Sequence, residues 1–250
     1  MREPYGDHED QFGELTLPEG ASAADPAPVA VLLHGGFWVR EYADLAPTRP
    51  LARDLADRGW AAWNVEYRRL GGGGGWPATA TDVSTAVDHL RALRDRGVPL
   101  DLDRVVTAGH SAGGHLALLD GARDPSDAAV RVRALVALAP LTDVRTAHGR
   151  DAESARIVER FMGGTPAADP DAYARASPVE RVPLGVPQLL VHGALDDAVP
   201  AAVIDAYVAA ARDAGDAVTL ERPERQGHFD LIEPGTEAWS TAVAWLHRHR

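Results

Sequence analysis

The heptapeptide GHSAGGH (Gly109–His115) places one serine among residues with little or no side chain. It follows the apolar run Val105–Ala108 and precedes the apolar run Leu116–Leu119. The pattern G-x-S-x-G between a strand and a helix predicts a sharp turn that lifts the Ser111 hydroxyl to the end of a sheet. Because a helix begins at this serine, its first N–H groups favour negative charge nearby. We therefore expect Ser111 to be a nucleophile rather than a plain helix N-cap, and Ala112 to donate its N–H to a developing oxyanion.

A serine hydroxyl reacts only when a base takes its proton, and such folds supply the partners in the order Ser, Asp or Glu, His. Downstream, Asp196 and Asp197 follow the apolar run Pro187–Gly193, and His228 follows the run Ala217–Pro223. Loops after parallel strands meet at one edge of a sheet, where sites of α/β proteins form. We therefore expect His228 to be the general base and a buried carboxylate to hold its tautomer.

The carboxylate and the base each have competitors. Asp143, after another expected strand, is a third carboxylate beside Asp196 and Asp197. His110 and His115 flank the nucleophile, but residues on that turn are poorly placed to face its hydroxyl. The histidines expected at strand ends, where they brace loops, or on helices and at the chain end are His34, His192, His89, His247 and His249.

The segment HGGFW (His34–Trp38) directly follows the apolar run Val29–His34. A glycine-rich loop at this place is typical of the second oxyanion donor, which predicts backbone donation from Gly36 and Phe37. Alone it fits a plain glycine turn equally well. Together with the serine turn, the acid and the base, it completes four parts in the expected order.

Short apolar runs alternate with longer amphipathic ones along the chain, which predicts an α/β fold with a mostly parallel sheet between helices. The expected strands are Val29–His34, Trp60–Tyr67, Arg104–His110, Val132–Pro140, Pro187–Gly193 and Ala217–Pro223, with an antiparallel edge at Phe12–Leu17. The expected helices are Leu45–Gly59, Thr79–Gly97, Gly113–Ala122, Ala201–Gly215 and Glu237–His249. We expect one domain over residues 1–250, with residues 141–187 as a small helical cap insertion because they exceed the length of an ordinary crossover.

The chain has 250 residues, a formal net charge of −12, no lysine and no cysteine. An acidic protein without a basic stripe binds nucleic acid and anionic membranes poorly, so we expect neither partner. The missing cysteines exclude disulfides, a thiolate nucleophile and cysteine metal sites. Without a signal-peptide pattern or a membrane-length apolar run, the protein is expected to be cytoplasmic. The oligomeric state, monomer or homodimer, stays open.

These motifs, together with EYRR (Glu66–Arg69), the glycine run with GWPAT (Gly75–Thr79) and GHSAGGHLAL (Gly109–Leu118), resemble the α/β-hydrolase fold family. Within it they look like the kynurenine formamidase-like and small esterase branch, which carries an HGGxW motif. The resemblance covers most of the chain, from Val29 to the last helix. It implies an α/β-hydrolase fold and a serine hydrolase that needs no metal or organic cofactor.

The family pattern H-G-x-x-D-x-x-V-P falls on HGALDDAVP (His192–Pro200), which implies Asp196 as the carboxylate of the triad. The G-H pattern before the last helix falls on Gly227 and His228. Phe37 stands where the hormone-sensitive-lipase branch has a third glycine. Its backbone donor is kept, and its side chain is expected to narrow the pocket.

Four aromatic residues are candidates for substrate binding because they lie beside these motifs or on the expected insertion: Trp38, Trp76, Phe161 and Phe229. Met162 is expected to help Phe161 roof the pocket. The interpretation is a serine hydrolase that cleaves a small-molecule carboxylic ester or aryl formamide through an acyl-enzyme. An exopeptidase of the prolyl-oligopeptidase type and a non-catalytic hydrolase-fold binding protein are the alternatives.

Overall fold

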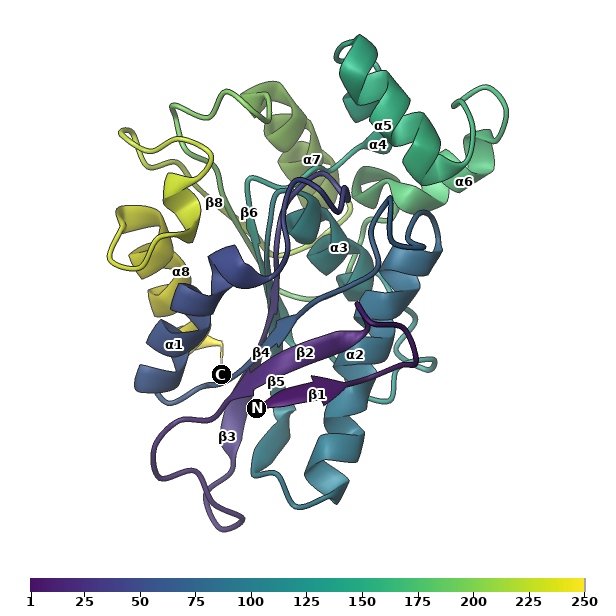
Figure 1. Ribbon diagram of the computed structural model, residues 1–250. Helices are drawn as coiled ribbons and strands as arrows, with labels where there is room; N and C mark the ends of the chain where they lie inside the picture. Colours follow the sequence, from purple (N-terminus) through teal and green to yellow (C-terminus); the bar gives the residue numbers. More distant parts are fainter. Residues whose placement is uncertain (250) are drawn as a thin grey trace.

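Eight strands form one sheet, in the order β1-β2-β4-β3-β5-β6-β7-β8, in the computed structural model, which describes residues 1–249 (Figure 1). β1 and β2 are antiparallel to their neighbours, and the six strands from β3 to β8 run parallel. The strands are β1 (Arg2–Pro4), β2 (Phe12–Thr16), β3 (Ala27–Leu33), β4 (Ala61–Val65), β5 (Leu100–His110), β6 (Ala134–Leu138), β7 (Gln188–Val191) and β8 (Val218–Glu221).

Helices cover both faces of this sheet (Figure 1). The helices are α1 (Arg49–Asp57), α2 (Ala78–Asp95), α3 (Ala112–Gly121), α4 (Val144–His148), α5 (Ala152–Met162), α6 (Pro170–Ala176), α7 (Ala201–Asp213) and α8 (Glu237–Arg248). Three 3-10 turns are η1 (Ala46–Thr48), η2 (Pro178–Glu180) and η3 (Asp230–Ile232).

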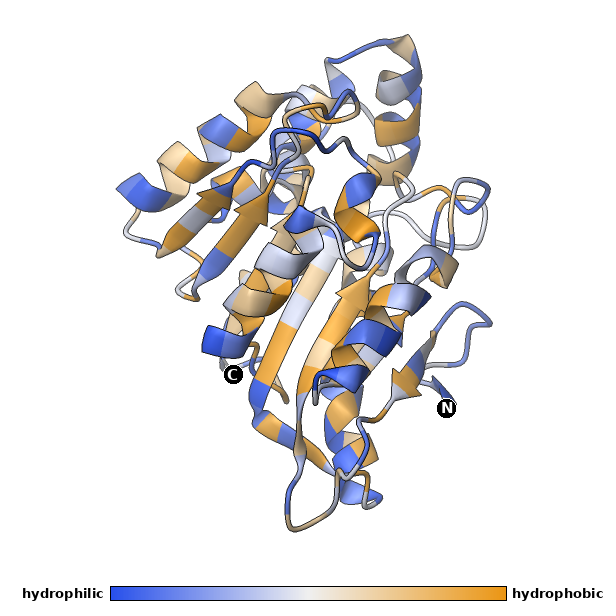
Figure 2. Cartoon of the chain, turned by 90° about the vertical axis from the view of Figure 1, so that its left-hand side faces the viewer, coloured by the Kyte–Doolittle hydropathy of each residue, from blue (hydrophilic) through white to orange (hydrophobic). Residues whose placement is uncertain are grey.

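Strand β3 shows why the central strands are apolar throughout, since all seven of its residues are buried. Val31 and Leu33 pack in one core cluster with residues of α2 and α3, such as Leu90 and Leu116. The alternate side chain of Leu32 packs in a second cluster on the opposite face, with residues of α1 and α8. Figure 2 shows the strands as mainly hydrophobic and the outer turns of several helices as hydrophilic. Successive side chains of a strand point to opposite faces of the sheet. Because both faces of the central strands are buried, every position is apolar and the sequence shows an unbroken apolar run.

The predicted order of strands and helices is confirmed, and β2 is antiparallel as predicted, although β1 rather than β2 forms the edge of the sheet. The expected helix Leu45–Gly59 is divided, because η1 comes first and Pro50 lies in the first turn of α1, where proline is favoured. Strand β1 was not predicted, since its short polar sequence has no apolar alternation.

The segment between β6 and β7 holds α4, α5 and α6, which Figure 1 shows beyond the end of the sheet and above α2 and α3. Each begins at an aspartate whose side chain accepts a hydrogen bond from a backbone N–H of the first turn: Asp143, Asp151 and Asp169. Helices α5 and α6 agree with the helical character expected of residues 141–187. The third, α4, was missed because five residues are too few to show a helical period.

Two glycines allow α3 to pack directly on the sheet. A Cβ at Gly109 would overlap the carbonyl oxygen of Gly113, and a Cβ at Gly113 would overlap the carbonyl oxygens of Leu33 and His34. The helix therefore starts in backbone-to-backbone contact with the end of β3. No residue with a side chain fits at either position without movement of these elements.

Gly113→Ala should destabilise the protein far more than Gly59→Ala. The first change forces a backbone shift between α3 and β3, and we expect a loss of more than about 3 kcal/mol of unfolding free energy. At Gly59 the φ angle is 87° and no atom lies within 4 Å of a Cβ, so alanine there costs about 1–2 kcal/mol of left-handed strain. Urea unfolding of both variants measures the difference, and equal losses would contradict the close packing.

Candidate active site

Ser111 lies between the end of β5 and the first turn of α3, as the serine pattern predicts. Its φ and ψ angles are 53° and −117°, a conformation that residues with a side chain rarely adopt. Its N–H donates to the carbonyl of Leu138 in β6 at 2.8 Å, and its carbonyl accepts from His115 N at 3.0 Å. The neighbouring strand and the helix therefore hold this strained turn in place, which is where strain of this kind is usually functional.

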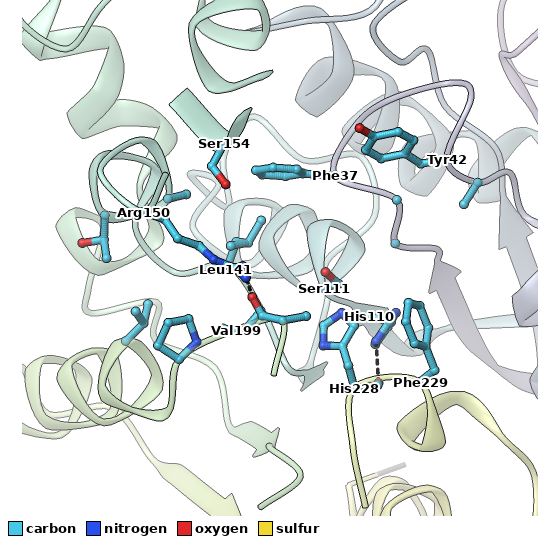
Figure 3. A pocket seen from close by; sticks show the side chains of 18 of the residues that line it. Phe37, Tyr42, His110, Ser111, Leu141, Arg150, Ser154, Val199, His228 and Phe229 are labelled. Atoms are coloured by element: carbon cyan, nitrogen blue, oxygen red, sulfur yellow. Dashed lines mark hydrogen bonds between the residues drawn. The ribbon is translucent and has the colours of Figure 1, made fainter. Parts of the chain in front are cut away.

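The loop after β8 carries His228 to the same edge of the sheet, where the loop after β7 carries Asp196. The His228 Nδ1 atom lies 2.8 Å from Asp196 Oδ2, and both side chains are almost fully buried. Figure 3 shows the His228 ring directly below the Ser111 side chain. Three side chains distant in the sequence are thus gathered at one edge.

Asp196 is held in its ionised form. Its other oxygen, Oδ1, accepts from the backbone N–H groups of Ala198 and Val199, both at 2.9 Å. Burial works to raise the pKa of Asp196, but the hydrogen bonds from His228, Val199 and Ala198 outweigh it, so this pKa lies below its ordinary value. Since an ionised carboxylate only accepts, His228 donates from Nδ1, and Nε2 is the ring nitrogen left to act on another group.

The two competing carboxylates have other surroundings, although Asp143 lines the same cavity as Ser111. Asp197 is exposed at the surface of the same loop. Asp143 is the N-cap of α4 and accepts from Arg145 N at 2.9 Å. Of the three candidates, Asp196 is the one in contact with His228.

The loop after β3 has three successive residues with positive φ: Gly36 at 108°, Phe37 at 51° and Trp38 at 58°. Bulky residues adopt this region at a cost of about 1–2 kcal/mol each, so the fold must enforce it. The loop also runs beside Ser111, because a Cβ at Gly35 would lie 3.3 Å from Ser111 Cβ. The backbone N–H groups expected to bind an oxyanion are therefore on a strained loop next to the serine.

A buried ionic network contacts the start of this loop at His34. Glu66 is almost fully buried, with Oε1 2.9 Å from His34 Nε2 and 3.2 Å from the guanidinium of Arg69. Its Oε2 accepts from Leu45 N at 3.0 Å. The hydroxyl of Tyr67 donates to the His34 carbonyl at 2.6 Å, and the two rings stack. The motif EYRR indicated these residues in the sequence, although no role could be assigned to them there.

A cavity of about 900 Å³ opens over Ser111 and His228. Its apolar wall includes side chains from the loops after β3, β6, β7 and β8, from α7 and from η3: Phe37, Leu141, Val199, Phe229, Val203 and Ile232. Arg150, from the loop between α4 and α5, also lines the cavity and donates to the carbonyl of Ala198 (Figure 3). Arg150 had no signal in the sequence, because the fold of the insertion decides that it meets the loop after β7.

The structure corrects three of the four predicted substrate-binding residues. Trp38 is fully buried and stacks on Phe161, with ring centroids 4.2 Å apart. Trp76 packs beside the same core cluster, and its main-chain N–H donates to the carbonyl of Phe161 at 2.7 Å. These three side chains, like Met162, belong to the packing between the insertion and the sheet rather than to the cavity wall. Phe229 does line the cavity.

Two histidines of the serine turn are buried and bonded to main-chain oxygens. His110 Nε2 lies 3.0 Å from the carbonyl oxygen of His228, and His115 Nε2 lies 2.8 Å from that of Ala176. Burial lowers the pKa of His110 to about 3 and that of His115 to about 4. Both rings are therefore neutral near pH 7, and both donate from Nε2 because a carbonyl oxygen only accepts.

Within residues 1–249, no helix combines the length and the apolar character that crossing a bilayer requires. Over the same range, histidine and carboxylate side chains form no group of three or more that could hold a metal ion.

The BD-FAE family model matches residues 14–206, a range that includes Ser111 and Asp196. The chain belongs to the BD-FAE family. Esterase LipC of Mycobacterium tuberculosis (strain ATCC 25618 / H37Rv) is 29% identical over 248 residues, which cover 90% of this chain and 60% of LipC. Esterase LipQ of the same strain is 31% identical over 218 residues, which cover 82% of this chain and 51% of LipQ. The chain thus spans about half to three fifths of the length of these relatives.

Solved structures share the architecture of this BD-FAE protein. A truncated form of a carbohydrate esterase from gut microbiota is 18% identical, with a TM-score of 0.86 over 99% of this chain and 94% of the other. The propionate-bound esterase Est2 of Thermogutta terrifontis is 22% identical, with a TM-score of 0.79 over 99% of this chain and 93% of the other. These likenesses confirm the predicted α/β-hydrolase fold.

Acid should destabilise the protein partly through His115, and His115→Gln should reduce that sensitivity. An unfolded histidine protonates near pH 6.5, whereas the folded pKa of His115 is about 4, so between these values the unfolded state binds more protons. Stability therefore falls as the pH drops below about 6.5, by at most about 1.4 kcal/mol per pH unit for this group. Urea unfolding of both proteins at pH 7 and pH 5 measures the effect. An identical pH dependence in the two would contradict a buried, neutral His115.

Proposed function

We propose that this protein hydrolyses carboxylic esters through a triad of Ser111, His228 and Asp196. The observation that carries the proposal is the buried contact of 2.8 Å between His228 and Asp196, with His228 lining the same cavity as the strained Ser111 turn. A nucleophile, an oriented imidazole and an ionised carboxylate are the parts that acyl transfer needs. The similarity to LipC and LipQ, both named as esterases, supports the same reaction class.

The first half of the reaction forms an acyl-enzyme. Ser111 Oγ attacks the ester carbonyl carbon while its proton moves to His228 Nε2, the nitrogen that Asp196 leaves unprotonated. The tetrahedral intermediate collapses, and the leaving alcohol takes the proton from Nε2. In the second half, a water gives its proton to His228 and attacks the acyl group. The carboxylic acid leaves as Ser111 Oγ regains the proton.

The backbone N–H groups of Ala112 and Phe37, with Gly36 beside them, are proposed to bind the oxyanion. Ala112 is the first residue of α3, so no carbonyl of its own helix accepts its N–H. Phe37 belongs to the strained loop that passes Ser111. Preorganised donors of this kind are each worth about a hundred- to a thousand-fold in turnover.

From the apolar lining of the cavity we infer that its substrates carry an apolar group of moderate size beside the scissile carbonyl. Residues 141–187 are proposed to act as a small cap, because Leu141 and Arg150 from this segment line the cavity. An aryl formamide would meet the same reactive groups as an ester. The activity assay must therefore compare esters with a formamide, because the resemblance carried by HGGFW includes formamidases.

Ser111→Ala should abolish hydrolysis of short nitrophenyl esters and labelling by a fluorophosphonate probe, because both need the serine oxygen. The assay compares nitrophenyl acetate and butyrate with N-formylkynurenine and an aminoacyl-nitroanilide, on the wild type beside the variant. We expect the esters to be the better substrates. Equal probe labelling of both proteins, or no turnover of any substrate, would overturn the proposal in favour of a binding protein, and selective cleavage of the anilide would indicate a peptidase.

Asp196→Asn should lower kcat by about ten-thousand-fold, since an amide at this position favours the wrong tautomer of His228. Asp197→Asn is the matched control, because this exposed neighbour carries the same charge on the same loop. The control should keep wild-type kcat. Initial rates with nitrophenyl butyrate measure both, and comparable losses in the two variants would exclude the assigned pairing.

A further inference from the structure

His110 is the residue before Ser111 in the G-x-S-x-G turn, and its buried ring lies beside the ring of His228 (Figure 3). The two ring centroids are 4.5 Å apart, and His110 Nε2 lies 3.0 Å from the main-chain oxygen of His228. The residue before the nucleophile thus contacts the backbone of the proposed base, 118 positions away in the sequence.

The direction of this hydrogen bond follows from its chemistry. A carbonyl oxygen only accepts, so His110 must carry a hydrogen on Nε2, and because the ring is neutral near pH 7 its Nδ1 is bare. The other edge of the ring faces the glycine loop, because a Cβ at Gly35 would lie 2.9 Å from His110 Nδ1. The ring is therefore confined between that loop and His228, in one tautomer.

The hydrogen bond from His110 holds the main chain of His228, whereas another hydrogen bond holds its side chain. Asp196 holds Nδ1 at 2.8 Å and so fixes one end of the imidazole. The next residue, Phe229, is 71% exposed, which places His228 at the border between the core and solvent. A second bond, from His110 to the main chain, ties this border loop to the turn that carries Ser111.

We propose that His110 is a positioning residue: its Nε2–H holds the main chain of His228, and with it the distance between the base and the Ser111 hydroxyl. This role rests on the proposed function of the Ser111, His228 and Asp196 triad. It also requires an uncharged ring, because a charged His110 would repel the imidazolium that forms at His228 during the reaction.

The surroundings of His110 favour the uncharged ring. Burial is the main cause of its low pKa, and the nearby His228 and His34 lower it further, while Asp196 acts in the opposite direction. These are the titratable groups facing it from the loops after β3, β7 and β8. The pKa of about 3 keeps His110 neutral across the range in which an imidazole base works.

His110→Leu and His110→Gln separate the donor from the bulk of the ring. Leucine fills the space without a donor, whereas the glutamine amide nitrogen can occupy the place of Nε2 and donate to the same carbonyl. We expect His110→Leu to lower kcat for nitrophenyl butyrate by about ten- to a hundred-fold with little change in KM, and glutamine to restore most of it. Equal losses in both variants, or wild-type kcat in His110→Leu, would overturn the proposal.

His115→Leu is the matched control for general damage to the core. His115 is an equally buried histidine of the same turn, and it donates to the carbonyl of Ala176 rather than to His228. Its replacement should lower the melting temperature and leave kcat close to that of the wild type. A kcat loss as large as that of His110→Leu would assign the effect to packing and so contradict a specific role of His110.

The wild-type protein offers a test that needs no variant to fold. Long-range ¹H–¹⁵N spectra of the imidazole rings should show His110 as the neutral Nε2–H tautomer from pH 5 to pH 8. A ring that titrates in this range, or that carries its hydrogen on Nδ1, would overturn the proposal. Because this readout does not depend on turnover, it separates a failure of the His110 contact from a failure of the esterase function.

Discussion

The site depends on a close approach of three backbone segments at the end of β5. Gly109, Gly113 and the end of β3 lie so near one another that no Cβ fits between them. Ser111 sits between the two glycines with a φ of 53°, and its neighbours in β6 and α3 bond its main chain. This contact fixes where α3 begins, and with it the position of the serine oxygen and of the first N–H groups of the helix.

The remaining parts are held against that turn by buried polar contacts rather than by covalent links. Asp196 orients one nitrogen of His228, and His110 bonds its main-chain oxygen. On the other side, Glu66 bonds to His34, where the strained loop after β3 begins. Buried groups of this kind are costly unless each is bonded, so removing one partner leaves the other unsatisfied and disturbs the geometry. The chemistry of the site and the stability of this edge of the sheet are therefore coupled.

The sequence predicts the site residues that directly follow the ends of strands. It does not predict which side chains line the cavity, because packing between distant segments determines that. The serine turn, the loop of Asp196 and the loop of His228 each follow an apolar strand, so topology alone brings them to one edge. The aromatic wall of the pocket was only partly predicted. Phe37 and Trp38 are adjacent, yet one lines the cavity and the other stacks on Phe161 in the core. The local sequence does not determine which of two adjacent aromatic side chains enters the core.

The most direct test of this account is a crystal structure of the protein after reaction with a phosphonate ester, whose phosphorus mimics the tetrahedral carbon of the intermediate. The account predicts a bond from Ser111 Oγ to phosphorus, with the phosphonyl oxygen within hydrogen-bond distance of the N–H groups of Phe37 and Ala112. His228 Nε2 should lie within hydrogen-bond distance of the adduct. An unmodified Ser111, or a phosphonyl oxygen directed away from both N–H groups, would contradict it.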